Sequence, residues 1–109
     1  MLPRHRKPFH PGEILFKEYL EPGGMTQVQL AQELHIPLQR INTIINGKRG
    51  ITAETAILLA KRLKTTPEFW MNLQAACDLY EASQHLARAA WTMQRFGEGR
   101  LLNPARTSS

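Results

Sequence analysis

The sequence predicts an all-α fold of five helices with a helical extension toward the C-terminus. Apolar residues recur at helical spacing, polar capping residues precede these runs, and proline or glycine separates them. The sequence has no β-rich stretch or internal repeat that favours another fold class. At 109 residues with 42% hydrophobic content, the chain suits one small domain with a single core.

The N-terminal part predicts a flexible basic arm at residues 1–9, followed by a first helix over residues 13–20. The arm contains Pro3, Pro8 and three cations. The helix should end at the Pro-Gly-Gly of residues 22–24, because proline and glycine do not sustain the helical hydrogen-bond ladder cheaply.

Two short helices separated by a tight turn are expected next. Thr26 and Gln29 form a capping box for the first of the pair. Its inward face carries Leu30, Ala31 and Leu34.

The second helix of the pair should run from about Pro37 to Asn46, with proline at the first helical position. Gly47 can then adopt the left-handed conformation that ends a helix. The inward positions, spaced i, i+3 and i+4, are Ile41, Ile44 and Ile45. Three β-branched residues would also suit a strand, but their spacing is helical.

Threonine caps mark the fourth and fifth helices. Thr52 precedes one of them, with Glu54 in its first turn; Thr66 precedes the other, with Pro67 and Glu68 in its first turn. The inward residues of the fourth helix are Ala56, Leu59, Ala60 and Leu63. The predicted buried stripe of the fifth is Phe69, Leu73, Ala76 and Tyr80, with Trp70 beside it extending the stripe to a second surface.

The helical pattern continues to about Phe96. We therefore expect a domain over residues 10–80, a helical extension over residues 81–96 and a disordered tail over residues 97–109, where glycine, proline and serine are frequent.

The net charge of +5 is concentrated between Pro37 and Lys64. Outside this window, eight cations and eight acids cancel. Inside it, Glu54 is the single acid and the cations are Arg40, Lys48, Arg49, Lys61, Arg62 and Lys64. Such clustering indicates a polyanionic partner. Charge alone leaves a merely solvated surface as the alternative.

The helix pair within residues 26–49 has the pattern of a helix-turn-helix, and its predicted partner is double-stranded DNA. The three isoleucines fix which face of the second helix is outward. The outward residues are Leu38, Gln39, Arg40, Asn42 and Thr43. Arg40 could pair with guanine, Gln39 or Asn42 with adenine, and Leu38 could meet a thymine methyl group; Thr43 offers a hydroxyl and a methyl group.

Phosphate contacts are expected on either side of these residues. Lys48 and Arg49 follow the second helix, where they would position the protein on the DNA backbone. Thr26 and Gln27 lie at the N-terminus of the first helix of the pair, whose N–H groups suit a phosphate oxygen. The alternative for every one of these polar residues is that it only solvates the surface.

Several other protein classes are disfavoured. A run of 18 apolar residues is lacking, which excludes a membrane span, and no apolar segment follows the N-terminal cations as in a secretory signal. The single Cys77 cannot form an intrachain disulfide, fits a reducing cytoplasm, and is expected to be a small core residue.

No enzyme, cofactor or metal site is expected. His5 and His10 lie in or next to the arm without a cysteine or carboxylate at ligand spacing. A Ser/His/Asp set, a glycine-rich phosphate loop and paired acids in a pocket cannot be placed.

The motifs also resemble those of known families. Thr26-Gln27, Leu30-Ala31, Ile36, Ile41, Ile44 and Asn46-Gly47-Lys48 are similar to the helix-turn-helix of phage repressors and XRE-type relatives. A wider resemblance, over about residues 8–82, is to the HigA-type antitoxins, also called virulence-associated protein I or plasmid-maintenance antidote proteins. It rests on four motifs, at residues 10–15, 40–42, 46–52 and 66–74.

The resemblance implies a five-helix, lambda repressor-like DNA-binding domain that forms a homodimer on an operator of inverted half-sites. It further implies binding and neutralisation of a HigB-type toxin, a ribosome-dependent mRNA endoribonuclease, and repression of the operon that encodes both. The DNA contacts that carry over are Gln27, Leu38, Gln39, Arg40, Thr43 and Lys48. Asn42 and Arg49 come from the outward-face argument alone.

The chain departs from the family pattern at two places. His35 stands where glycine is common and a positive φ is needed, and Pro37 replaces a common serine or threonine cap. Residues 82–109, including Trp91, match no pattern of known role. Two alternatives stay open: a stand-alone repressor without a toxin partner, and a protein-interaction module that has lost DNA affinity.

Overall fold

The computed structural model describes residues 7–96, with side chains through residue 90. Most of the arm predicted at residues 1–9, and the whole tail predicted at residues 97–109, lie outside the described residues. The described part is all-α, as predicted, and contains no strand. The chain divides into two units, residues 1–78 and residues 79–109.

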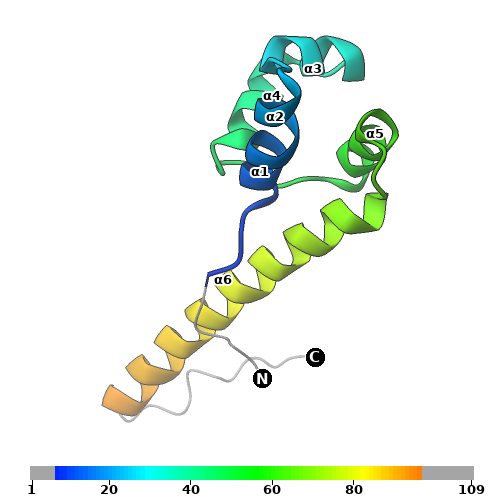
Figure 1. The fold of residues 1–109 in the computed structure, drawn as a ribbon. Helices are drawn as coiled ribbons and strands as arrows, with labels where there is room; N and C mark the ends of the chain where they lie inside the picture. Colours follow the sequence, from blue (N-terminus) through cyan, green and yellow to red (C-terminus); the bar gives the residue numbers. More distant parts are fainter. Residues whose placement is uncertain (1–6, 97–109) are drawn as a thin grey trace. The chain divides into compact units, whose positions relative to one another are not determined.

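The first unit begins with one continuous helical segment, longer than expected (Figure 1). It comprises α1 (Pro11–Ile14), a π-helical stretch η1 (Leu15–Leu20) and α2 (Glu21–Gly23). The prediction of a helix confined to residues 13–20 was therefore wrong at both ends. The early start has a local cause, since Nδ1 of His10 accepts a hydrogen bond of 2.9 Å from the N–H of Gly12.

The late end of this segment depends on the π turn. The N–H of Glu21 bonds to the carbonyl of Phe16, five residues earlier. In a regular α-helix the ring of Pro22 would clash with the carbonyl group four residues earlier. The wider π turn leaves space for this ring. The segment then ends at Gly24, whose φ of 67° is left-handed.

The predicted helix pair is present as α3 (Gln27–Leu34) and α4 (Leu38–Ile45). Both halves of the capping box form: the N–H of Gln29 donates to Oγ1 of Thr26 (3.0 Å), and the N–H of Thr26 donates to Oε1 of Gln29 (2.8 Å). His35 ends α3 with φ 58°, which confirms the positive φ expected there.

Pro37 is the N-cap of α4 and not its first helical residue, which corrects the predicted boundary by one position. Its ψ of 139° is extended, and its carbonyl accepts the N–H groups of Arg40 and Ile41. Ile41 and Ile44 are fully buried, as predicted, and Gly47 has a left-handed φ of 75°.

Helices α5 (Ala53–Leu63) and α6 (Pro67–Phe96) begin at the predicted threonine caps. The N–H of Thr55 donates to Oγ1 of Thr52 (3.3 Å), and the N–H of Phe69 donates to Oγ1 of Thr66 (3.1 Å). Lys64 ends α5 in the left-handed region with φ 60°.

The inward face of α6 keeps Leu73, which is half-buried against the core as predicted, but Trp70 and Cys77 take the buried positions predicted for Phe69 and Ala76. Trp70 is 0% exposed and Cys77 is buried, whereas Phe69 is 36% exposed and Ala76 is exposed. The indole N–H of Trp70 donates to Oγ1 of Thr65 (2.7 Å), so the whole ring can be buried with its polar atom satisfied. Burial of Cys77 agrees with the predicted core role.

Gln74, on the same face of α6 as Trp70, also points toward the rest of the first unit. Its Oε1 accepts the N–H of Ile51 (2.7 Å). Because Gln74 is polar, the inward face of α6 cannot be recognised from its apolar residues alone, and Phe69 was therefore wrongly predicted to be buried.

The core of the first unit contains buried side chains from η1, α3, α4, α5 and α6. The N-terminal segment approaches α4 closely, since a Cβ at Gly12 would lie 1.8 Å from the carbonyl oxygen of Ile44. Only glycine permits this contact. The fully buried side chains include Leu15, Leu20, Leu30, Ile41, Ile44, Leu59 and Trp70.

The second unit contains the remainder of α6, residues 79–96. Leu79 and Leu86 are mostly exposed there. Within residues 7–96, no helix is long and apolar enough to cross a membrane.

Candidate nucleic-acid interface

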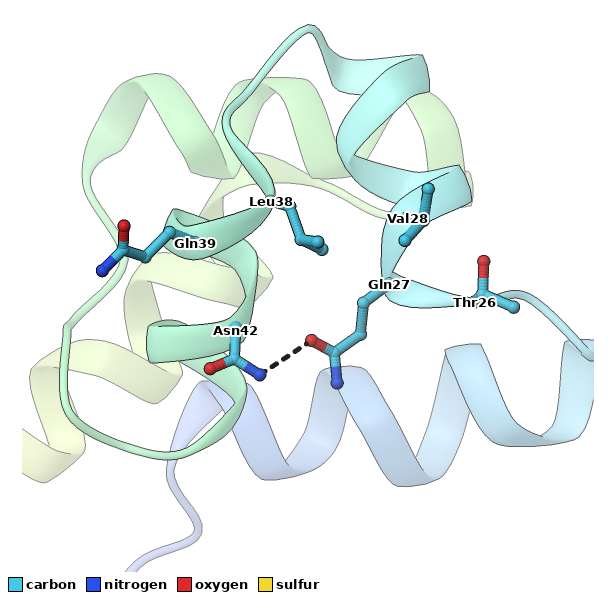
Figure 2. A pocket seen from close by; sticks show the side chains of 6 residues that line it. All are labelled: Thr26, Gln27, Val28, Leu38, Gln39 and Asn42. Carbon is cyan, nitrogen blue, oxygen red and sulfur yellow. Dashed lines mark hydrogen bonds between the residues drawn. The ribbon is translucent and has the colours of Figure 1, made fainter.

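A hollow of about 550 Å³ lies between the start of α3 and the outward side of α4 (Figure 2). We call it the α3–α4 groove. Its lining residues are Thr26, Gln27, Val28, Leu38, Gln39 and Asn42. Five of these six were predicted DNA contacts, so the fold brings residues from two helices to one surface.

A bond between two amide side chains bridges the groove. Nδ2 of Asn42 donates to Oε1 of Gln27 (3.2 Å), as Figure 2 shows. Within α4 and its cap, Nδ2 of Asn46 donates to Oδ1 of Asn42 (3.2 Å). Because the oxygen of Gln27 accepts a bond from Asn42, its NH₂ group is the part that can donate to a ligand.

A second hollow, of about 310 Å³, lies next along α4. Its lining residues are Pro37, Gln39, Arg40, Thr43 and Arg49. Gln39 lines both hollows, so they adjoin on the outward side of α4. Two arginines, Arg40 and Arg49, therefore line the same hollow at this surface, each with a guanidinium group.

Two threonine hydroxyls have partners inside the protein. Oγ1 of Thr43 donates toward the carbonyls of Gln39 and Arg40, each at 3.0 Å, so this side chain presents its methyl group and oxygen lone pairs outward. The hydroxyl and N–H of Thr26 both belong to the capping box. At this helix end, the N–H groups that suit an anion are therefore those of Gln27 and Val28 in the first turn.

Lys48 and Arg49 are exposed in the loop after α4. Their backbone N–H groups both bond to the carbonyl of Thr43, at 2.9 and 3.2 Å, which folds the loop back onto the helix. Arg49 lines the second hollow, and Lys48 lines neither of the two.

The basic window of the sequence is divided among different elements. Arg62 of α5 forms an ion pair with Glu33 of α3, which offsets its charge. Lys61 and Lys64 also belong to the end of α5, where they complement the helix dipole. The cations on α4 and its exit loop are thus Arg40, Lys48 and Arg49.

Sequence reasoning missed two residues of this surface. Val28 lines the groove although it is apolar and 47% exposed, and Asn46 holds the amide of Asn42. Val28 could have been noticed as an apolar residue outside the inward stripe of α3. Among the described residues, no group of three or more histidines, cysteines or acids could hold a metal ion.

Fold and surface together define a helix-turn-helix protein, and comparison with known proteins agrees. The helix-turn-helix family model matches residues 16–70. The uncharacterized HTH-type transcriptional regulator YbaQ of Escherichia coli is 46% identical over 74% of this chain and 72% of its own length. Virulence-associated protein I of Dichelobacter nodosus is 47% identical, covering 69% of each chain. Antitoxin HigA-1 of Vibrio cholerae is 43% identical, covering 70% of this chain and 71% of its own.

Solved structures give the same grouping. An addiction-module antidote protein of the HigA family from Coxiella burnetii is 46% identical with a TM-score of 0.69, over 83% of this chain and 95% of its own. The Pseudomonas aeruginosa antitoxin HigA, solved with the higBA promoter, is 36% identical with a TM-score of 0.73, over 76% and 90%. The chain belongs to the helix-turn-helix family, within the group of HigA antitoxins and virulence-associated protein I.

Proposed function

We propose that this chain binds operator DNA with the outward side of α4 in the major groove and represses its own operon. One observation carries the proposal: two adjoining hollows follow α4, lined by amide donors and acceptors and by two arginines. The major groove admits one helix and displays the groups that these side chains bind. The similar Pseudomonas aeruginosa HigA, solved with its promoter, supports it.

We assign base reading to Leu38, Gln39, Arg40, Asn42 and Thr43. Arg40 would pair with guanine, and Gln39 or Asn42 with adenine. Since the hydroxyl of Thr43 donates to its own helix, its part is a methyl contact or a hydrogen bond that it accepts.

We assign the contacts with the DNA backbone to Lys48 and Arg49, and to Thr26 and Gln27 at the start of α3. The loop after α4 is folded back on Thr43, which holds its two cations close to the helix that would enter the groove. Such contacts fix position and carry no sequence information.

Two substitutions test this division of labour. Arg40→Ala should weaken operator binding by about 1–3 kcal/mol and relax the preference at one base pair. Lys48→Ala should weaken operator and random DNA alike and reduce the salt dependence by about one counterion. Affinities measured by fluorescence anisotropy at several salt concentrations separate the two. Equal losses on both DNAs for both variants would contradict it.

We further propose that the chain acts as a homodimer on inverted half-sites. A single α4 covers a few base pairs, and two-fold symmetric operators are the usual means by which such helices reach adequate specificity. Light scattering of the complex should give two chains per operator, and a single chain would contradict this. The domain boundaries we propose are residues 10–80 for DNA binding and residues 81–96 for a helical extension.

We also propose a second partner, a HigB-type toxin that cleaves mRNA on the ribosome and that this chain neutralises. The support is the antitoxin grouping of its relatives. The toxin site would lie on the arm, the first helical segment or the C-terminal helix, and not on the outward side of α4. The product of the adjacent gene should co-purify with this chain and lose its mRNA cleavage in the complex.

A stand-alone repressor is the second candidate, because a relative at 46% identity is named as an uncharacterized HTH-type transcriptional regulator. It predicts the same operator binding without a complex with any adjacent gene product. Failure of the co-purification, together with intact operator binding, would select it.

A further inference from the structure

Two apolar side chains face each other across the α3–α4 groove. Val28 comes from α3 and Leu38 from α4, and both point into the hollow (Figure 2). They are 47% and 45% exposed, and the lining that they share is mostly apolar. Both therefore leave apolar surface in water on a side of the protein that is otherwise polar and basic.

Polar groups frame this apolar slot. Gln27 and Asn42 are bonded to each other beside it, and Gln39 lies at its other margin. The engaged oxygen of Gln27 leaves its NH₂ group as a donor. The slot thus combines an apolar surface with a nearby hydrogen-bond donor.

Thymine is the base with matching chemistry in the major groove. It presents a 5-methyl group next to the O4 acceptor, whereas cytosine presents an N4 donor that the apolar slot would leave without a partner. Resting on the proposed DNA binding, we propose that the α3–α4 groove receives the 5-methyl group of an operator thymine. Val28 then makes α3 a base-reading helix, beyond the phosphate contacts assigned to its first turn.

The size of the effect follows from the methyl group alone. Burial of one methyl or methylene group contributes an affinity of about fourfold. Replacing thymine by deoxyuridine removes only this group, so the affinity should fall by that factor where the base occupies the slot. At thymines that meet neither the slot nor the methyl group of Thr43, the replacement should change little.

The experiment replaces each operator thymine by deoxyuridine, one symmetric pair at a time, and measures affinity by anisotropy. The wild-type chain should lose about fourfold per half-site at one position, and 5-bromodeoxyuridine, whose bromine is about the size of a methyl group, should restore binding. Val28→Ala and Leu38→Ala should each reduce the discrimination at that position.

Two further variants control for structure. Val28→Thr keeps the volume but makes the slot polar, and it should also reduce discrimination. Ile57→Ala removes an aliphatic side chain that is 50% exposed on α5 and does not line the groove, so it should keep full discrimination. Thermal unfolding checks that each variant is folded.

The outcomes separate this inference from the function on which it rests. If the wild-type chain prefers its operator over scrambled DNA but tolerates deoxyuridine everywhere, the methyl slot is wrong and the DNA binding stands. If no operator preference exists, the proposed function itself fails. Undiminished discrimination in folded Val28→Ala would remove α3 from base reading.

Discussion

Gly12→Ala tests the contact that places α4 against the N-terminal segment. Gly12 is a buried residue of α1, and an added Cβ would lie 1.8 Å from the carbonyl oxygen of Ile44 and 2.9 Å from Cα of Ile45. Ordinary contact begins near 3.4 Å, so the backbones would have to separate by about 1.6 Å. No flexible side chain is available to move instead.

Two opposing terms determine the sign of the effect. Alanine is favoured over glycine within a helix by about 0.5–1 kcal/mol. Overpacking costs about 1–3 kcal/mol, and a clash of the added Cβ with backbone atoms, which cannot turn aside, belongs at the upper end. We therefore expect the free energy of unfolding to fall by about 2 kcal/mol, equivalent to a Tm lower by roughly 10 °C for a domain of this size.

The matched control is Gly23→Ala, in the same helical segment. A Cβ at Gly23 meets nothing within 4 Å, so only the propensity term applies. Urea denaturation followed by circular dichroism should show Gly23→Ala as stable as the wild type or up to about 1 kcal/mol more stable. A Gly12→Ala variant that matches or exceeds wild-type stability would refute the close approach of α1 to α4.

Two other predictions concern stability. His35→Gly should raise the free energy of unfolding by about 0.5–1 kcal/mol in urea denaturation, because glycine adopts the left-handed φ of 58° without strain; a loss would mean that the imidazole is stabilising at this turn. Trp70→Ala should cost about 3–5 kcal/mol and Phe69→Ala less than half as much, because only the indole is fully buried; the reverse order would support the stripe that the sequence alone predicted.

The sequence predicted well those features that depend on neighbouring residues. Caps at Thr26, Thr52 and Thr66 form as expected, because each bonds to an N–H three residues later in the chain. The inward isoleucines of α4 were also placed correctly, since one strong helical spacing decides them.

Features that depend on packing between distant segments were not predictable. The choice of Trp70 over Phe69 rests on Thr65 and on the ring of Tyr19, whose centroid lies 5.5 Å from that of Trp70. The ion pair of Arg62 with Glu33 was missed for the same reason. A single sequence gives no information about such partners.

In the candidate interface, too, features set by local spacing were predicted and features set by packing between helices were not. An outward face on α4 follows from its spacing, so most lining residues of the two hollows were named in advance. Val28 was not, because its role depends on where α3 lies relative to Leu38. The bridge between Gln27 and Asn42 likewise joins residues 15 apart.

The most direct test of the central claim is a hydroxyl-radical footprint of the full chain on the DNA upstream of its own gene, beside a scrambled fragment. We expect two inverted half-sites about one helical turn apart, and an affinity at least about 10³-fold above that for scrambled DNA. Uniform weak protection of both fragments, or one asymmetric site, would contradict operator recognition by a pair of α4 helices.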